Sequence, residues 1–227
     1  MDAITENWDL YFRSFGYTVT LFVIAAVLSM LFGTLLCALR VGPVAIMRAA
    51  ATTYVTLVRN TPLVVVFAFF SFAAPMFGLT FSFLDVHIGQ FDFTEAFGAA
   101  VVSMTLYTSA FVCEALRSGI NAVPLGQAEA ARAVGLTFGG TMTQVVLPQA
   151  IRASVPPLAS VQIAMLKNTS VAAAFGILEA VGQMRRFTNN FSSQRTEIFI
   201  FFALGYVILV LLLSFAASRL ERKWRIA

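Results

Sequence analysis

The sequence predicts an all-α integral membrane protein, with five transmembrane helices in a single domain of residues 1–227. Of its residues 59% are hydrophobic and only 11% are charged, a composition unlike that of soluble domains. The apolar residues gather in runs of about 20, which is long enough to cross a hydrocarbon core of about 30 Å. The net charge of +4 does not indicate nucleic-acid binding, because the basic residues are dispersed and mostly flank the apolar runs.

The apolar runs define a core at about residues 17–217. The expected spans are 17–39, 60–79, 96–116, 156–178 and 198–217. Aromatic residues at helical spacing before the first span predict a short helix in the membrane interface. These residues are Trp8, Tyr11, Phe12 and Phe15. Within the first span small residues stand four apart, which predicts a face that another helix approaches closely. They are Ala25, Ser29, Gly33 and Cys37.

Charged residues between the spans predict the topology. Residues 40–59, expected to form a loop, carry three arginines and no acid, and the segments at 117–152 and beyond 217 are also basic. Residues 1–17 and 78–95 are acidic. This alternation predicts an external N-terminus, a cytoplasmic segment 117–152 and a cytoplasmic C-terminus. Residues 179–197 are an exception, since they are slightly basic although expected to be external.

The fourth span is unusually polar. Ser160, Lys167 and Ser170 share one helical face, and polar residues also lie on a face about 200° around the helix. Lipid tolerates such a helix badly, so we expect it inside the bundle or beside a water-filled path. The expected substrate-path residues are Gln162, Lys167, Asn168, Thr169 and Ser170.

Two charged groups in the spans have alternative interpretations. Lys167 is expected near the bilayer centre, where a charge costs at least about 2.5 kcal/mol unless it is paired or hydrated. It therefore lies in a substrate path, or it pairs with Glu114 or a backbone carbonyl and only holds the bundle together. Glu114 and Arg117 are three residues apart on one face, so we expect them to form a local structural ion pair.

A polar island at residues 127–148 separates two long apolar runs. Good helix formers precede Gly135, a residue that can take the left-handed conformation that ends a helix. A second short segment follows until Pro148, which removes a backbone donor and marks the next element. We therefore expect two short helices, at about residues 126–146, joined at a glycine.

The island also matches a motif. The pattern is Glu-Ala-Ala, three residues, Gly, nine residues, a β-branched residue, one residue and Leu-Pro. Its positions are filled by Glu129, Ala130, Ala131, Gly135, Val145, Leu147 and Pro148. This pattern resembles the cytoplasmic loop motif of permease subunits of type I ATP-binding cassette importers, with Val145 where that family more often has Ile. The stretches 59–62 and 166–170 are similar to sequences in polar amino-acid permeases, and the chain as a whole most resembles glutamate or aspartate uptake permeases.

The resemblance implies the type I importer permease fold, in a bacterial plasma membrane. The motif residues, with Leu136 beside Gly135, would contact an ATPase subunit. The implied partners are ABC ATPase subunits, a second permease subunit that is identical or homologous, an external binding protein and a polar amino acid such as glutamate, aspartate or glutamine. The chain would not be an enzyme and would bind no cofactor, because ATP and Mg²⁺ are used by the separate ATPase. It contains no phosphate-binding loop or His-Glu-x-x-His motif.

Two other functions explain part of the sequence. An ion-gradient-driven carrier or channel could use Lys167 and Glu114 as a relay. A membrane partner that binds an ATPase but transports nothing would need only the island. The first explains the buried charges but not the island, and the second leaves the polar fourth span without a role.

Overall fold

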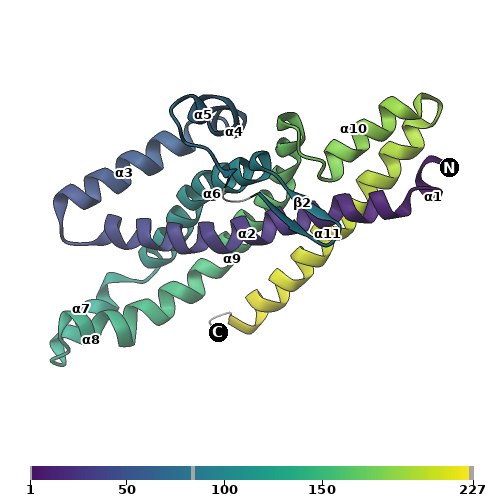
Figure 1. Cartoon of the computed structure of the whole chain (residues 1–227). Coiled ribbons are helices and arrows are strands. Elements are labelled where there is room, and N and C mark those ends of the chain that lie inside the picture. The colour runs from purple at the N-terminus through teal and green to yellow at the C-terminus, as the bar shows by residue number, and fades with distance from the viewer. Residues whose placement is uncertain (1, 83–84, 225–227) are drawn as a thin grey trace.

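The computed structural model describes residues 2–82 and 85–224, and helices make up most of it (Figure 1). In the described part of the chain three helices are long and apolar enough to cross a membrane. They are α2 (Trp8–Val41), α6 (Glu95–Asn121) and α11 (Arg195–Trp224). A hairpin of β1 (Val86–Ile88) and β2 (Phe91–Phe93) follows the second expected span, so the fold departs from an all-α one at this loop.

Two bent helix pairs could supply further spans. The first joins α3 (Ala45–Arg59) to residues Leu63–Met76, with a bend of 104°. Residues Leu63–Met76 comprise α4 (Leu63–Ala68), the π-helix η1 (Phe69–Ala73) and α5 (Ala74–Met76). The second joins Phe138–Phe175 to α10 (Ala180–Asn190), with a bend of 48°. Counting each pair as one span, the described residues contain up to five spans.

The expected loop at residues 40–59 is wrong, because most of it forms α3. Gly42 and Pro43 make the turn, and Ala45 begins a helix of alanine and other helix-compatible residues. The helix stops at Arg59 and the chain bends sharply before α4. Pro62 explains the break, since it lacks a backbone donor and disfavours a helical conformation in the residue before it.

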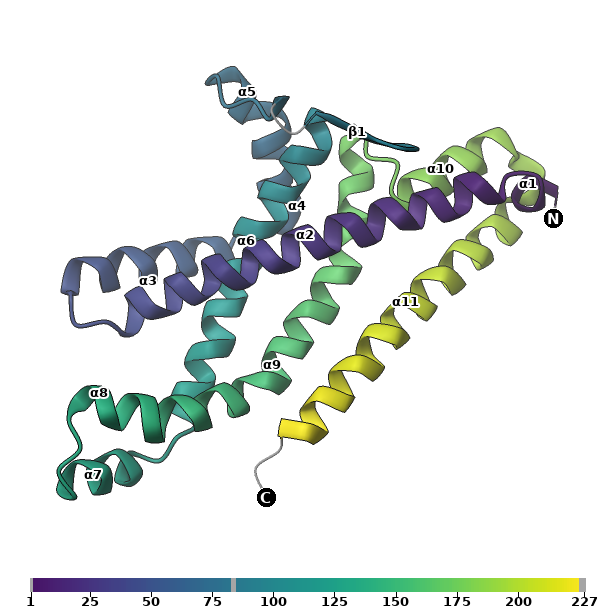
Figure 2. The same ribbon diagram turned by 60° about the horizontal axis from the view of Figure 1, so that its bottom comes forward.

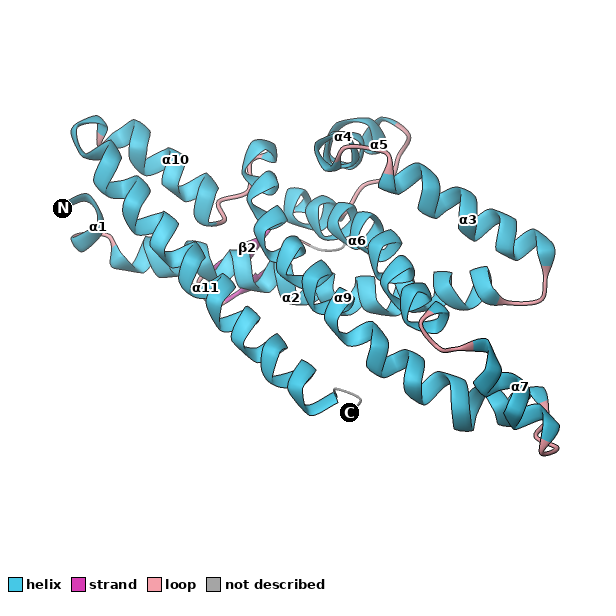
Figure 3. Ribbon diagram, turned by 180° about the vertical axis from the view of Figure 1, so that it is seen from behind, coloured by secondary structure: helices cyan, strands magenta, loops and turns pink. Residues whose placement is uncertain are grey.

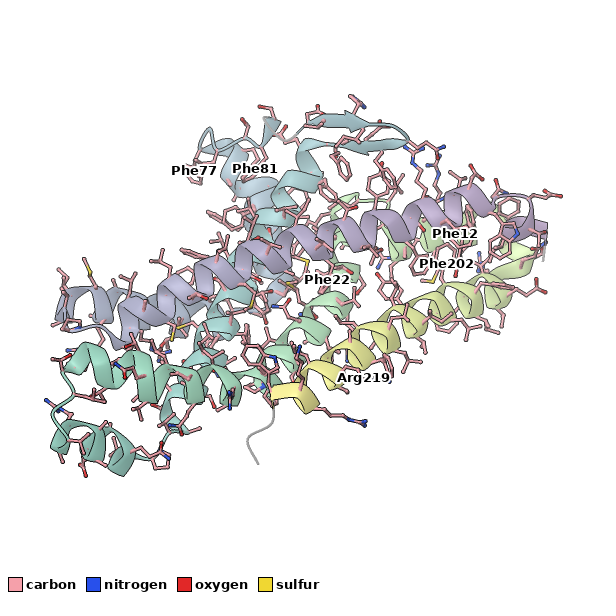
Figure 4. All side chains as sticks on the ribbon, turned by 90° about the horizontal axis from the view of Figure 1, so that it is seen from below. Phe12, Phe22, Phe77, Phe81, Phe202 and Arg219 are labelled. Carbon is pink, nitrogen blue, oxygen red and sulfur yellow. The ribbon has the colours of Figure 1, made fainter. Side chains whose placement is uncertain are left out.

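The separate interfacial helix expected at the N-terminus is also wrong. A short helix α1 (Asp2–Thr5) precedes the aromatic residues, which lie in the first turns of the 34-residue α2. At 1.5 Å per residue α2 is about 50 Å long, so it must tilt to fit a bilayer core of about 30 Å. Its aromatic end packs on α11, where the rings of Tyr11 and Phe202 are 5.0 Å apart. Figure 4 shows Phe12 and Phe202 at the N-terminal ends of α2 and α11.

The small-residue face expected in the first span is confirmed. All four of its residues are buried. At Gly33 an added Cβ would lie 2.6 Å from the Cβ of Val112, so only glycine permits this approach of α2 to α6. Cys37 and Cys113 are free and buried, and both belong to the apolar cluster between α2, α3 and α6.

The arrangement has two ends. The short helices α7 (Leu125–Ala133) and α8 (Phe138–Thr141) project at one end, where the C-terminal end of α11 also lies (Figure 2). The hairpin, α10 and the N-terminal helix lie at the opposite end. Helix α9 (Leu147–Asn168) runs between the two ends beside α6 and α11 (Figure 3).

Candidate functional site

The motif of the polar island lies in the projecting α7–α8 segment. Gly135 has φ +92°, and the backbone N–H of Leu136 donates to the carbonyl of Ala131 at 3.1 Å. The N–H of Gly135 donates to the carbonyl of Arg132 at 3.0 Å. These two bonds form a Schellman cap, which requires a left-handed residue after the helix. The left-handed turn expected at Gly135 is therefore confirmed.

The second short helix expected in the island is not a separate unit. Thr137 caps α8, and its hydroxyl accepts a hydrogen bond of 3.2 Å from the N–H of Gly140. The helix continues through the π-helix η3 (Met142–Val146) into α9. Pro148 lies where η3 passes into α9, and there it removes one backbone donor from the continuous run. The segment α8 is therefore part of the same helical run as α9.

The motif residues divide between an exposed face and a packed face. Glu129, Ala130 and Gly135 are exposed, together with Leu147 and Pro148, whereas Ala131 is buried. Leu136 and Val145 are half-buried. Large apolar side chains that the sequence motif does not include are exposed beside them. They are Leu125 at 81%, Val134 at 81% and Phe138 at 72% exposure. An apolar surface of this kind, at the tip of a polar segment, is typical of a protein–protein contact.

The fourth expected span changes its helix type near Lys167. Helix α9 ends at Asn168 and continues as the 3₁₀-helix η4 (Thr169–Phe175), which stops at Gly176 with φ +85°. Lys167 is exposed, and the hydroxyl of Ser170 donates to its carbonyl at 2.8 Å. Thr169 is fully buried. A change to 3₁₀ geometry inside a long helix often marks a functional hinge.

Two of the five expected path residues, Asn168 and Gln162, line different cavities. Asn168 and Ser160 line a groove of about 380 Å³ with Tyr107 and Thr108 of α6. Gln162 lines a different, apolar cavity of about 610 Å³ between α2, α9 and α11. Both polar atoms of its amide are buried without a hydrogen-bond partner. The structure therefore does not bring the five residues together as one site.

The expected ion pair of Glu114 with Arg117 is not formed among the described residues. The carboxylate of Glu114 instead contacts Arg40, at the end of α2, and lies 3.3 Å from the guanidinium of Arg59 in α3. Lys167 has no ion pair in the described part of the chain, so its pairing with Glu114 is not observed either. Arg40 and Arg59 are distant in sequence and reach Glu114 only because α2, α3 and α6 pack together.

Glu179 is a buried acid, which the sequence does not indicate because the residue falls in an expected loop. Its side chain is 0% exposed and caps α10 by accepting a hydrogen bond from the N–H of Gly182 at 3.0 Å. The hydroxyls of Thr18 and Tyr206 donate to the same carboxylate, at 3.4 Å and 2.6 Å. Tyr206 also lies 3.5 Å from the hydroxyl of Thr169. The network joins α2, α10 and α11 to the start of η4. In the sequence, its only indication is that Thr18 and Tyr206 are polar residues inside two apolar runs.

Comparison with known proteins agrees with this geometry. Residues 29–226 match the family described as binding-protein-dependent transport system inner membrane component. The glutamate transport system permease protein GluC of Corynebacterium glutamicum is 41% identical over 211 residues, which cover 92% of each chain. The glutamate/aspartate import permease protein GltJ of Escherichia coli is 32% identical, over 99% of this chain and 97% of its own.

Solved structures give the same result. The crystal structure of an amino acid ABC transporter with histidines superposes with a TM-score of 0.85 and is 27% identical. The match covers 97% of this chain and 96% of that one. An inward-facing MetNI methionine ABC transporter, 21% identical, superposes with a TM-score of 0.74 and shares the fold.

Proposed function

The chain belongs to the family of binding-protein-dependent transport system inner membrane components, and we propose from this that it is the permease subunit of an ATP-driven importer of polar amino acids. One observation carries the proposal: the motif from Glu129 to Pro148 lies on an exposed, partly apolar tip, where a partner can dock. Members of this family are non-enzymatic components of the inner membrane. The chain itself thus requires an ATPase partner for energy.

The substrate is an amino acid with an acidic or amide side chain. Glutamate is the first candidate, because two corynebacterial relatives about 40% identical to this chain are glutamate permeases. Aspartate and glutamine come next, since more distant relatives are named for them. These names describe the relatives, and the uptake assay below tests transport by this chain.

The coupling mechanism follows from the continuous helix. ATP binding pulls two ATPase subunits together, and each would move the α7–α8 tip of the permease that it holds. Because Phe138–Phe175 is one continuous helical run, a displacement at Phe138 is carried along α9 toward Lys167. The 3₁₀ segment η4 begins at Thr169 and would absorb part of that movement. The cytoplasmic side closes and the outer side opens, which gives alternating access.

The proposed topology has five spans, an external N-terminus and a cytoplasmic C-terminus. Three long helices and two bent pairs support the number. The positions of the two ends support the orientation, since α7 and α8 lie with the C-terminal end of α11 and opposite the N-terminal helix (Figure 2). The charge alternation along the sequence agrees with the same orientation.

A second permease subunit, identical or homologous, would complete the path. The groove between α6 and α9 contains Asn168 and Ser160, and Lys167 is exposed although it belongs to an apolar bundle. A charge in this position needs water or a partner. We place the path of the amino acid on this side of α9, with an external binding protein delivering it to the hairpin end.

Uptake in proteoliposomes tests the function. The permease is reconstituted with its ATPase and binding protein. Uptake of radiolabelled L-glutamate is measured without ATP, with ATP inside the vesicles and with ATP outside them. We expect uptake only when ATP reaches the ATPase. The imposed ion gradient should have no effect on it. Uptake that follows an ion gradient and ignores ATP would establish the carrier function, to which the family match gives no support. A complex that assembles but shows no substrate-stimulated ATP hydrolysis would instead be transport-inactive.

A further inference from the structure

A pocket of about 360 Å³ lies at the hairpin end, opposite the α7–α8 tip. It is lined by residues of α2, β2, α10 and the segment at 176–178. Pockets of this size suit a small polar molecule, and they usually contain a few polar groups that fix its orientation. It is separate from the α6–α9 groove that contains Asn168.

Gln183 of α10 is the buried polar group of this pocket. It is 4% exposed, and its backbone N–H is satisfied by the carbonyl of Glu179 at 2.8 Å. Its side-chain amide has no hydrogen-bond partner among the described residues, although it lines the pocket. The amide faces the pocket, so it can donate a hydrogen bond to a ligand that enters there, and that bond would stabilise the bound ligand.

The charges of the pocket are unbalanced. The carboxylate of Asp92 lies 3.6 Å from the guanidinium of Arg13 and 2.6 Å from Nδ1 of His87, so it is already paired. Arg186 also lines the pocket, but it has no ion pair in the part of the chain that the structure describes. One guanidinium therefore remains without a counter-charge beside an amide without a partner.

We propose that this pocket binds the carboxylate of an anionic amino acid. The guanidinium of Arg186 would pair with both carboxylate oxygens, as its planar fork allows, and the amide of Gln183 would donate a further hydrogen bond. The inference rests on the proposed function and extends it. It assigns an entry subsite, selective for negative charge, to the end of the permease where an external binding protein would release its amino acid.

Direct binding to the full-length chain in lipid nanodiscs, without the binding protein, tests the subsite. Saturation-transfer NMR measures the affinity for L-glutamate and for L-glutamine. We expect L-glutamate to bind more tightly, and Arg186→Gln to weaken it about tenfold, the scale of one charge-assisted contact. Gln183→Leu should weaken it as well. Arg185→Gln is the matched control, because Arg185 has the same charge but lines a different cavity. Each variant is first shown to melt at the temperature of the unchanged chain.

Several outcomes would overturn the subsite. Equal binding of the two amino acids removes the selectivity, and equal losses in Arg185→Gln and Arg186→Gln reduce it to general charge. An effect of Arg186→Gln on binding-protein docking alone would assign Arg186 to a protein contact. Uptake by the complete complex separates the two levels of inference. If the unchanged complex transports no amino acid, the proposed function fails. If it transports, and Arg186→Gln has an unchanged KM for L-glutamate, only the subsite fails.

Discussion

The hydroxyl of Tyr206 in α11 lies 2.6 Å from the carboxylate of Glu179, which is fully buried at the start of α10. The two residues are 27 positions apart, and their bond holds the C-terminal helix against the capped end of α10. The same hydroxyl lies 3.5 Å from Thr169, the first residue of the 3₁₀ segment after Lys167. Glu179 and Tyr206 thus connect the hairpin end of the molecule to the proposed path.

Tyr206→Phe is expected to destabilise the fold by about 1–3 kcal/mol, because the buried carboxylate loses a donor. A thiol-reactive dye can measure the melting temperature in detergent, since both cysteines are free and buried until the protein unfolds. Tyr107→Phe is the matched control, because the hydroxyl of Tyr107 has no hydrogen-bond partner among the described residues. Equal melting temperatures for the two variants would show that the Glu179 network contributes nothing to stability.

Glu114→Gln is expected to destabilise the fold, because Arg40 and Arg59 lose the carboxylate that they share. The cost should be about 1–3 kcal/mol, below the 3–5 kcal/mol of a fully buried pair, since the Glu114 side chain is 26% exposed. Arg117→Gln should cost less than about 1 kcal/mol, because Arg117 forms no ion pair among the described residues. The same thermal assay compares the two. A larger loss for Arg117→Gln would restore the local pair that the sequence suggests.

Gly135→Asp is expected to abolish co-purification of the ATPase and ATP-driven uptake. Any side chain at φ +92° is strained, and aspartate adds a charge to the exposed face of the motif. Gly89→Asp is the control, because it makes the same change at a glycine with φ +60° in the hairpin, at the opposite end. Both variants should insert into the membrane in normal amounts. Retained ATPase binding by Gly135→Asp would remove the motif from the docking surface.

Lys167→Met is expected to lower L-glutamate uptake at least tenfold while the complex still assembles, because the exposed ammonium group is lost from the proposed path. Lys223→Met is the control, since Lys223 is exposed near the end of α11, where the neighbouring residues line a cavity with the first half of α9 and not with Lys167. Normal uptake by Lys167→Met would leave Lys167 with a structural role.

The histidine of the hairpin should titrate above the ordinary value. A hydrogen bond to Asp92, followed by the charge of Asp92, raises the pKa of His87 above its usual 6.5. A raised pKa means that the pair stabilises the hairpin below the ordinary pKa and that this contribution is lost as pH rises through the raised value. NMR titration of His87 measures it. Asp92→Asn should return the pKa toward 6.5, and a titration that is unchanged by this substitution would exclude the pair.

Much of this protein follows from its sequence alone. Runs of apolar residues can only be satisfied in lipid, so they predict the membrane class without any tertiary information. Spacing within one helix predicts the small-residue face at Ser29 and Gly33, and Gly135 predicts a left-handed turn, because both depend on local geometry. The motif from Glu129 to Pro148 predicts the family for the same reason, since its residues are close in sequence.

Contacts between distant segments were decided only by the tertiary structure. Glu114 is paired by Arg40 and Arg59 instead of its helical neighbour Arg117, because the packing of three helices brings their long side chains to one carboxylate. Glu179 reads as a loop charge until Thr18 and Tyr206 are placed beside it. Spacing along a chain describes one helix, whereas the partner of a buried charge depends on which helices surround it.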